Sequence, residues 1–172
     1  RIDRATRTGV EMVRIERSAR GHEKLREAAV LFGVDLSGMD LSNIVLMGAE
    51  MDGVILGGTK LHDAKLRGAQ MPNARLKGAE FHDADCTKAN FDGAEAAGAE
   101  FIRTDLNGAA LENIKNMKDT DFTEAHMQET RLQGSKLSGG IFHETRMSEK
   151  TVIDEDQIEY ARAGGALGLE DR

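Results

Sequence analysis

A bulky apolar residue recurs at every fifth position from Leu36 to Leu111, and this spacing is the strongest constraint on the fold. The series reads Leu36, Leu41, Leu46, Met51, Leu56, Leu61, Leu66, Met71, Leu76, Phe81, Cys86, Phe91, Ala96, Phe101, Leu106 and Leu111. A period of five matches neither the 3.6 residues of a helical turn nor the two-residue alternation of a strand. The stretch therefore predicts a repeated supersecondary unit.

Two further positions of the unit are regular. A small residue, usually alanine as in Ala64, stands two places before the bulky residue, and Gly, Asn or Asp stands two places after most of them. These three residue types tolerate the positive φ that the third position of a type II turn requires. Each unit thus has a small, a polar, a central, a variable and a turn position, and it is expected to form one side of a coil.

Units such as Ala64-Lys65-Leu66-Arg67-Gly68 and Ala89-Asn90-Phe91-Asp92-Gly93 resemble the A-(D/N)-L-x-G repeat of the pentapeptide-repeat family. The resemblance implies an all-β solenoid, a right-handed quadrilateral β-helix with four pentapeptides in each coil. The central and small residues would point inward, and the other three would point outward.

The spacing continues beyond Leu111 after one additional residue. Met117 follows at six positions, and the series resumes as Met117, Phe122, Met127, Leu132, Leu137, Phe142, Met147 and Val152. The extra residue is expected to form a bulge between Glu112 and Asn116. The two series comprise 16 + 8 = 24 units, or about six coils.

Residues 1–32 precede the predicted β-helix of residues 33–153 and have a different character. Thr8-Gly9-Val10-Glu11 indicates a capping box at the start of a helix, which Gly21 is expected to end. Leu25, Ala28, Ala29 and Phe32 then follow one face of a second helix. We expect residues 22–32 to cap the open end of the solenoid, as repeat proteins require, whereas residues 4–20 are better suited to bind a partner or to self-associate.

Residues 154–172 are predicted to form a C-terminal helix and tail. Asp154-Glu155-Asp156-Gln157 is typical of a helix N-terminus, and Gly164-Gly165 is expected to end the helix before a loose tail from Ala166 to Arg172. The helix is interpreted as a second cap. The alternative is a homodimer interface, which the resemblance implies because some family members pair through their C-termini.

Residues twenty positions apart, or twenty-one across the extra residue, are expected to stack in successive coils. The second face then has the central residues Leu41, Leu61, Phe81, Phe101, Phe122 and Phe142, and its four phenylalanines predict a stacked aromatic ladder in the core. The outward acids of this face are Asp40, Asp63, Glu80, Asp83, Glu100, Asp121, Glu124 and Glu144. Against Lys60 and Arg103 they give −8 + 2 = −6. This acidic face is either an interaction surface or a solvated surface that keeps the rod soluble.

Two repeated dipeptides on the second face are the only candidates for a metal site. His62-Asp63 and His82-Asp83 lie one coil apart, so imidazoles stacked about 4.8 Å apart with carboxylates beside them could hold a divalent ion. The alternative is that the His-Asp dipeptide recurs only because the sequence is repetitive, and that it binds no metal. Cys86 falls in a core column and is expected to be inert. No catalytic triad or phosphate-binding loop is present, so we predict no enzyme, no catalytic residue and no cofactor.

The composition limits the partners. A net charge of −7 argues against direct nucleic-acid binding, and no apolar run is long enough to span a membrane. No signal peptide is recognisable, and one cysteine excludes an internal disulfide, so we expect a cytoplasmic location while secretion or effector delivery stays open.

Two functions follow from these features. The first is a non-enzymatic scaffold or protein-interaction module, and the resemblance implies that it is part of a longer secretion- or effector-associated bacterial protein. The second, implied by the resemblance, is an acidic DNA mimic that binds DNA gyrase or another topoisomerase and modulates or protects it.

Overall fold

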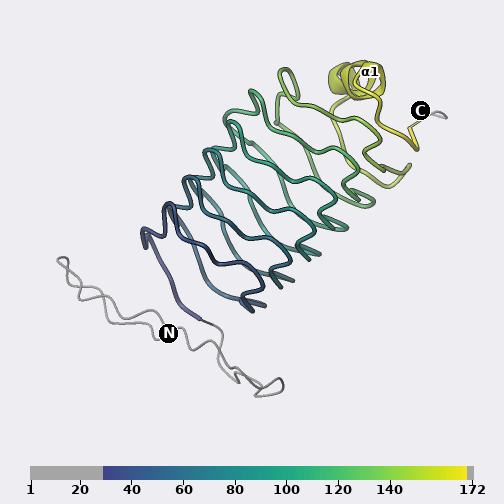
Figure 1. The fold of residues 1–172 in the computed structure, drawn as a ribbon. Coiled ribbons are helices and arrows are strands. Elements are labelled where there is room, and N and C mark those ends of the chain that lie inside the picture. Colours follow the sequence, from purple (N-terminus) through teal and green to yellow (C-terminus); the bar gives the residue numbers. More distant parts are fainter. Residues whose placement is uncertain (1–28, 170–172) are drawn as a thin grey trace.

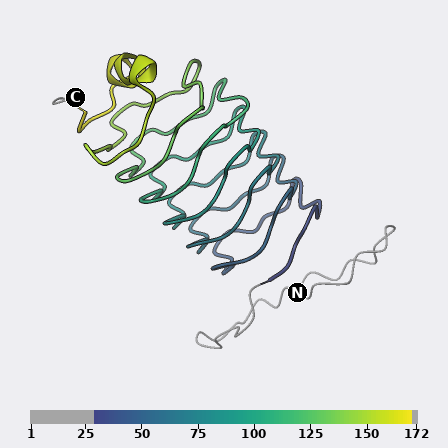
Figure 2. The ribbon, with the colours of Figure 1, turned by 180° about the vertical axis from the view of Figure 1, so that it is seen from behind.

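The computed structural model describes residues 29–169, which form a stack of four-sided coils with one helix at its C-terminal end (Figures 1 and 2). The helix, α1, spans Glu155–Ala163. Successive coils are joined side by side through single parallel bridges such as Glu50↔Gln70 and Gln70↔Asn90. The fold is the predicted right-handed quadrilateral β-helix. The predicted helix starting at Thr8 and its end at Gly21 lie outside the described residues.

The unit around Leu61 shows how the backbone builds one side of a coil. The N–H groups of Leu61 and Asp63 donate to the carbonyl oxygens of Glu80 and His82 in the next coil, at 2.7 and 3.0 Å. Ala64 N–H closes the corner by donating to Leu61 O at 3.1 Å. Asp63, at the turn position, has a φ of 55°. The turn position therefore needs positive φ, which explains why Gly, Asn and Asp recur there.

Asp and Asn recur at the polar position because their side chains bond the variable position of the same unit. Asp40 Oδ1 accepts the N–H of Ser42 at 3.0 Å, and Asn90 Oδ1 accepts that of Asp92 at 2.9 Å. This local bond satisfies a backbone donor at each corner where it occurs.

Buried hydroxyl groups replace alanine at several small positions. Thr59 Oγ1 donates to Leu36 O at 2.8 Å, and Thr104 Oγ1 donates to Phe81 O at 2.7 Å, both from one coil to the preceding one. Thr120, Thr130, Ser135, Thr145 and Thr151 repeat this contact. A polar residue can be buried here because its hydroxyl always finds a carbonyl oxygen.

Four stacked phenylalanines run along the second face inside the rod. Phe81, Phe101, Phe122 and Phe142 are fully buried, and neighbouring ring centroids lie 4.7, 5.2 and 5.3 Å apart with nearly parallel planes. Phe91 crosses from the opposite face and meets the Phe101 ring edge-on at 5.6 Å. Ala96, the next central residue along the chain, is small and buried.

The β-helix begins earlier than predicted. Val30 bridges Glu50, and Leu31 is buried with 2% exposure as a further central residue. Gly33 is its turn residue, with a φ of 61°. The predicted boundary at residue 33 is therefore wrong, because the five-residue period extends to Leu31 and prevails over the helical spacing that ended at Phe32.

The first extra residue lies where it was predicted. Lys115 N–H donates to Ala94 O at 3.0 Å, whereas Asn116 O accepts from Ala96 N at 3.1 Å. Lys115 and Asn116 thus share the place of one residue opposite Glu95, which is the geometry of a β-bulge.

A second extra residue was missed. Ile153 is buried with 8% exposure, whereas Val152, predicted as a central residue, is 39% exposed and bridges Arg131. The corner Ser148–Thr151 holds one residue more than the others. This longer corner places Val152 at the polar position and turns it outward.

The C-terminal segment closes the last coil. Gln157 and Tyr160 of α1 accept the N–H groups of Leu137 and Gly139 at 3.0 and 2.8 Å. Beyond the helix and its C-cap Gly164, Leu167 O accepts from Met147 N at 2.8 Å. Leu169 is buried with 1% exposure. The prediction of a loose tail is therefore wrong for residues 166–169, because they continue the bridge pattern of the last coil, and residues 170–172 lie outside the described residues.

Candidate interaction surface

The second face presents three outward rows along the rod. The polar row joins Asp40, Lys60, Glu80, Glu100, Asp121 and Ile141 through consecutive bridges. The variable row contains His62 and His82, and the turn row contains Asp63, Asp83, Arg103, Glu124 and Glu144. The predicted acidic residues therefore lie on one face, but cations and imidazoles are interleaved with them.

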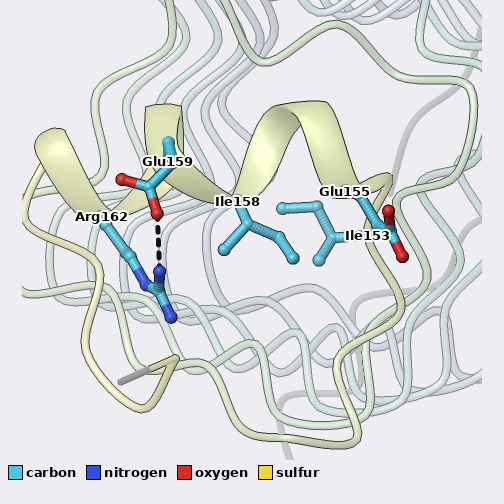
Figure 3. Close-up of a pocket in the computed structure, with 5 residues that line it drawn as sticks. All are labelled: Ile153, Glu155, Ile158, Glu159 and Arg162. Carbon is cyan, nitrogen blue, oxygen red and sulfur yellow. Dashed lines mark hydrogen bonds and ion pairs between the residues drawn. The ribbon is translucent and has the colours of Figure 1, made fainter. Parts of the chain in front are cut away.

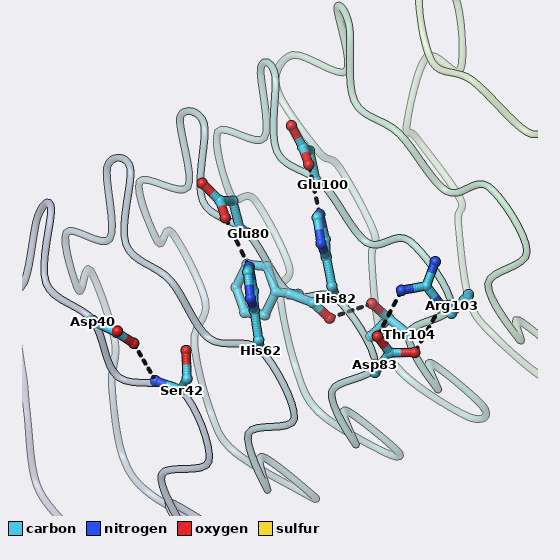
Figure 4. A network of polar contacts seen from close by, with 10 residues as sticks. Asp40, Ser42, His62, Glu80, His82, Asp83, Glu100, Arg103 and Thr104 are labelled. Atoms are coloured by element: carbon cyan, nitrogen blue, oxygen red, sulfur yellow. Dashed lines mark hydrogen bonds and ion pairs between the residues drawn. The ribbon is translucent and has the colours of Figure 1, made fainter.

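Two histidine–glutamate pairs occupy the middle of this face (Figure 4). His62 Nε2 lies 2.8 Å from Glu80 Oε2, and His82 Nε2 lies 2.6 Å from Glu100 Oε2. The two imidazole rings stack with centroids 4.7 Å apart and planes 3° from parallel. The one-coil repeat thus holds two identical pairs in register.

Two carboxylates of this face accept hydrogen bonds that stabilise their ionised form. Arg103 donates to both oxygens of Asp83, at 2.8 and 2.7 Å, and this holds the pKa of the Asp83 carboxyl below its ordinary value. Hydrogen bonds from Ser42 similarly lower the pKa of Asp40. Both groups therefore stay ionised in mildly acidic solution.

The predicted metal ligands do not converge. The two histidines turn toward Glu80 and Glu100, and Asp83 turns toward Arg103 (Figure 4). Within residues 29–169, no three His, Cys, Asp or Glu side chains are grouped closely enough to hold a metal ion. The sequence placed each histidine beside the aspartate that follows it, but the fold pairs it with a glutamate eighteen residues later.

The pairing with glutamate was not foreseen because it joins different coils. Only the stacked rows show that the polar position of one coil reaches the variable position of the coil before it. Asp63 and Glu124 form no ion pair within the described part of the chain. They leave the turn row with negative charge that is free for a partner.

Cys86 belongs to the core and not to this surface. It is fully buried, and burial raises the pKa of its thiol far above the ordinary value. The thiolate is the reactive form of cysteine, so this residue is inert packing.

A shallow hollow at the C-terminal end was also not predicted. It has a volume of about 560 Å³ and lies between α1 and the end of the core, lined by Ile153, Glu155, Ile158, Glu159 and Arg162 (Figure 3). Arg162 is held by Glu159 at 2.6 Å and donates to Leu169 O. Its two isoleucines are core and helix residues, so the hollow belongs to the closure of the rod.

No helix in residues 29–169 has the length and apolar character needed to cross a membrane.

Comparisons with known proteins agree with this architecture. The sequence profile of the family described as Pentapeptide repeats matches residues 29–68, 59–95, 79–115 and 116–149. The matched residues cover most of the chain, and the protein therefore belongs to the pentapeptide-repeat family. No curated protein sequence matches the chain.

Several solved structures resemble the chain. The pentapeptide repeat protein Rfr23 from the cyanobacterium Cyanothece 51142 is 19% identical, with a TM-score of 0.57 over 70% of this chain and 91% of that chain. HetL, involved in heterocyst differentiation regulation in Nostoc sp. strain PCC 7120, is 18% identical, with a TM-score of 0.34 over 70% of each chain. A trypsin-treated form of QnrB1, a plasmid-mediated fluoroquinolone resistance protein, is 17% identical, with a TM-score of 0.37 over 81% of this chain and all of that chain. The likeness to Rfr23 extends to the fold alone.

Proposed function

We propose that the chain is a non-enzymatic scaffold that binds a protein partner through its second face. The observation that supports this proposal is the regular array of charged and aromatic groups on that face, with the two His–Glu pairs in register. The backbone beneath the array forms a hydrogen bond at each corner of the middle coils. A rigid array loses little conformational entropy when it binds.

The charge of the face defines the chemistry of the partner. Eight acids against two bases give −8 + 2 = −6, so a basic protein surface is the complementary partner. Such complementarity speeds association and weakens as salt is added. We therefore expect capture of the partner to decline between low and physiological ionic strength.

The test uses three substitutions at turn positions, Asp63→Lys, Glu124→Lys and Glu144→Lys. Lys88 and Arg103 already occupy turn positions with φ of 57° and 54°, so lysine fits this backbone. The triple variant changes the charge of the second face from −6 to −6 + 6 = 0. The matched control, Asp119→Lys, Glu129→Lys and Glu149→Lys, makes the same change in net charge on other faces.

Proteins captured from a cell lysate by the three chains would be quantified by mass spectrometry. A partner retained by the wild type and the control but lost by the second-face variant supports the proposal. Equal retention by all three chains contradicts it.

The alignment of acidic residues along one face supports a second candidate, an acidic DNA mimic. Two rows of charges about 4.8 Å apart within each row would give at most about one charge per 2.4 Å. B-DNA carries about one per 1.7 Å. Lys60, Arg103 and the two histidines dilute the array further, so the scaffold is the better-supported function. Gyrase supercoiling assays with and without a quinolone distinguish the two functions. If the wild-type chain inhibits gyrase or protects it from the quinolone and the second-face variant does not, the mimic is supported. If the wild-type chain has no effect on gyrase, the mimic is excluded.

Homodimerisation through α1 stays a prediction, which analytical ultracentrifugation of the full chain would test.

A further inference from the structure

We propose that the two stacked histidine–glutamate pairs make binding at the second face dependent on pH, so that a basic partner is held near neutral pH and released in mild acid. This regulation rests on the proposed function, because it acts on the same face.

The two imidazoles lie between the polar row and the turn row of the second face (Figure 4). The His62 side chain is 34% exposed and that of His82 is 24% exposed, so solvent protons reach both rings. Each ring is also close to a carboxylate of the next coil, since the His62–Glu80 and His82–Glu100 distances are 2.8 and 2.6 Å. A proton gained by either ring therefore places a positive charge directly beside a glutamate.

Acidic groups outnumber basic ones around the two rings. Besides the paired glutamates, the charged groups of the surrounding rows are Asp40, Lys60, Asp63, Asp83 and Arg103. The hydrogen bond from Arg103 lowers the pKa of the Asp83 carboxyl most, and the two imidazoles lower it further. The rings thus act electrostatically on a carboxylate of the turn row as well as on the glutamates of the polar row.

Protonation of the two rings reduces the charge of the whole face. Histidine is the side chain that ordinarily gains a proton between about pH 8 and about pH 5, whereas Asp and Glu ordinarily stay ionised there. With both rings neutral the second face has a charge of −8 + 2 = −6, and with both protonated it has −6 + 2 = −4. A basic partner is therefore attracted more strongly above this pH interval than below it.

The stacking concentrates this change in a small area. The ring centroids are 4.7 Å apart, which is less than the roughly 8 Å over which physiological salt screens a charge. A partner that bridges two coils is therefore exposed to both new charges. His143, further along the same row, is 68% exposed and lies 3.7 Å from Glu144, so it adds a looser and more distant charge.

The experiment uses the full chain and a rhodamine-labelled dodecalysine peptide as the basic probe. Fluorescence anisotropy in low salt gives the dissociation constant at about pH 7.5 and about pH 5.5, on either side of the ordinary histidine pKa. The wild type is expected to bind about fourfold more weakly at the lower pH, because each new charge about 10 Å from a cation in water costs about a factor of two.

The decisive variant is His62→Gln with His82→Gln. Glutamine is neutral at both pH values, and its amide can still donate to the facing glutamate. Whatever the affinity of this double variant, the ratio of its two dissociation constants is expected to fall below about twofold. His126→Gln, which removes a histidine of the third face, is the control and should keep the fourfold ratio. Equal ratios in the wild type and the double variant would overturn the proposal.

The triple variant Asp63→Lys, Glu124→Lys and Glu144→Lys separates the regulation from the proposed function. If it binds the peptide at the higher pH as tightly as the wild type, the second face is not the binding surface and the proposed function fails together with its regulation. If it loses the peptide while the double variant keeps the pH dependence of the wild type, only the regulation fails.

A reciprocal measurement follows the protons instead of the peptide. Because binding and protonation oppose each other, bound peptide must make proton uptake by the two rings harder. NMR signals of the imidazole Cε1–H groups, assigned with the single His62→Gln and His82→Gln variants, should therefore titrate at a lower pH when the peptide is present. The His126 signal should not move. Titration of all three signals at the same pH with and without peptide would overturn the proposal.

Discussion

The two ends of the rod differ in how their terminal coils are covered. At the C-terminal end, α1 and residues 165–169 accept the N–H groups of the last coil, as at Gly139 and Met147. At the N-terminal end, the described residues offer enlarged apolar side chains and an exposed rim instead. A solenoid must protect both ends, because an open coil exposes core and unpaired backbone alike. Both ends keep some large apolar side chains exposed, so the comparison teaches that they differ in the backbone partners that the C-terminal segment supplies and in the larger, half-buried apolar residues of the first coil.

The largest expected effect compares two buried leucines at the central positions of the first and last coils. Leu137 lies in the last coil beneath α1 and is 0% exposed, whereas Leu36 lies in the first coil and is 3% exposed. We expect Leu137→Ala to lower the free energy of unfolding by about 4 kcal/mol and Leu36→Ala by about 2 kcal/mol, because a cavity at the first coil is more easily relieved. Urea denaturation measures both values. Equal losses would mean that the two ends are packed equally well.

The next effect compares two glycines with positive φ. A Cβ at Gly168 would collide with the carbonyl oxygen of Met147, whereas a Cβ at Gly33 would meet no atom within 4 Å. Gly168→Ala is expected to cost about 3 kcal/mol, and Gly33→Ala about 1 kcal/mol from its φ alone. Hydrogen exchange at the Met147 amide should accelerate in the first variant only. Unchanged protection there would show that residues 165–169 do not close the coil.

A smaller effect isolates one hydrogen bond of the C-terminal closure. Tyr160→Phe removes the hydroxyl that accepts from Gly139 N–H but keeps the ring. The loss is expected to be about 1 kcal/mol, or an approximately fivefold faster exchange of the Gly139 amide. The Asp119 amide, which donates to Gly139 O at 2.7 Å, is the internal control. Faster exchange of both amides would indicate that the helix has come away as a whole.

The smallest expected effect concerns the Arg103–Asp83 ion pair, which lies midway between the two ends of the rod. Arg103 lowers the pKa of Asp83 below 3.8, so the pair adds stability above that pH and loses it as the pH falls and Asp83 is protonated. The difference in melting temperature between wild type and Arg103→Ala should therefore be small at pH 6 and vanish in strong acid. A difference that grows as the pH falls would contradict this assignment.

Most of the core followed from the sequence because the repeat is strictly periodic. The five-residue spacing places Phe81, Phe101, Phe122 and Phe142 in one column, and the structure stacks their rings. The bulge near Lys115 followed from a single break in the same period. Whether a side chain points inward or outward could be predicted without knowing its tertiary contacts, because the turn at each corner is formed by residues of the same unit.

The errors lie where local signals compete or lapse. Leu31 was hidden because Leu25, Ala28 and Phe32 also fit a helical stripe. Ile153 was missed because Val152 keeps the five-residue count and is equally apolar, while the longer corner at Ser148–Thr151 has no signature in residue type.

The sequence by itself determined the coil and, for the units with the regular five-residue spacing, the column of each residue and the direction of each side chain, because each depends on the order of residues within five positions. Only the tertiary structure decided which outward groups pair and how the last coil is closed. His62 meets Glu80 rather than Asp63, and Leu167 returns to Met147, because those contacts join residues about twenty positions apart, where no local pattern chooses among neighbours.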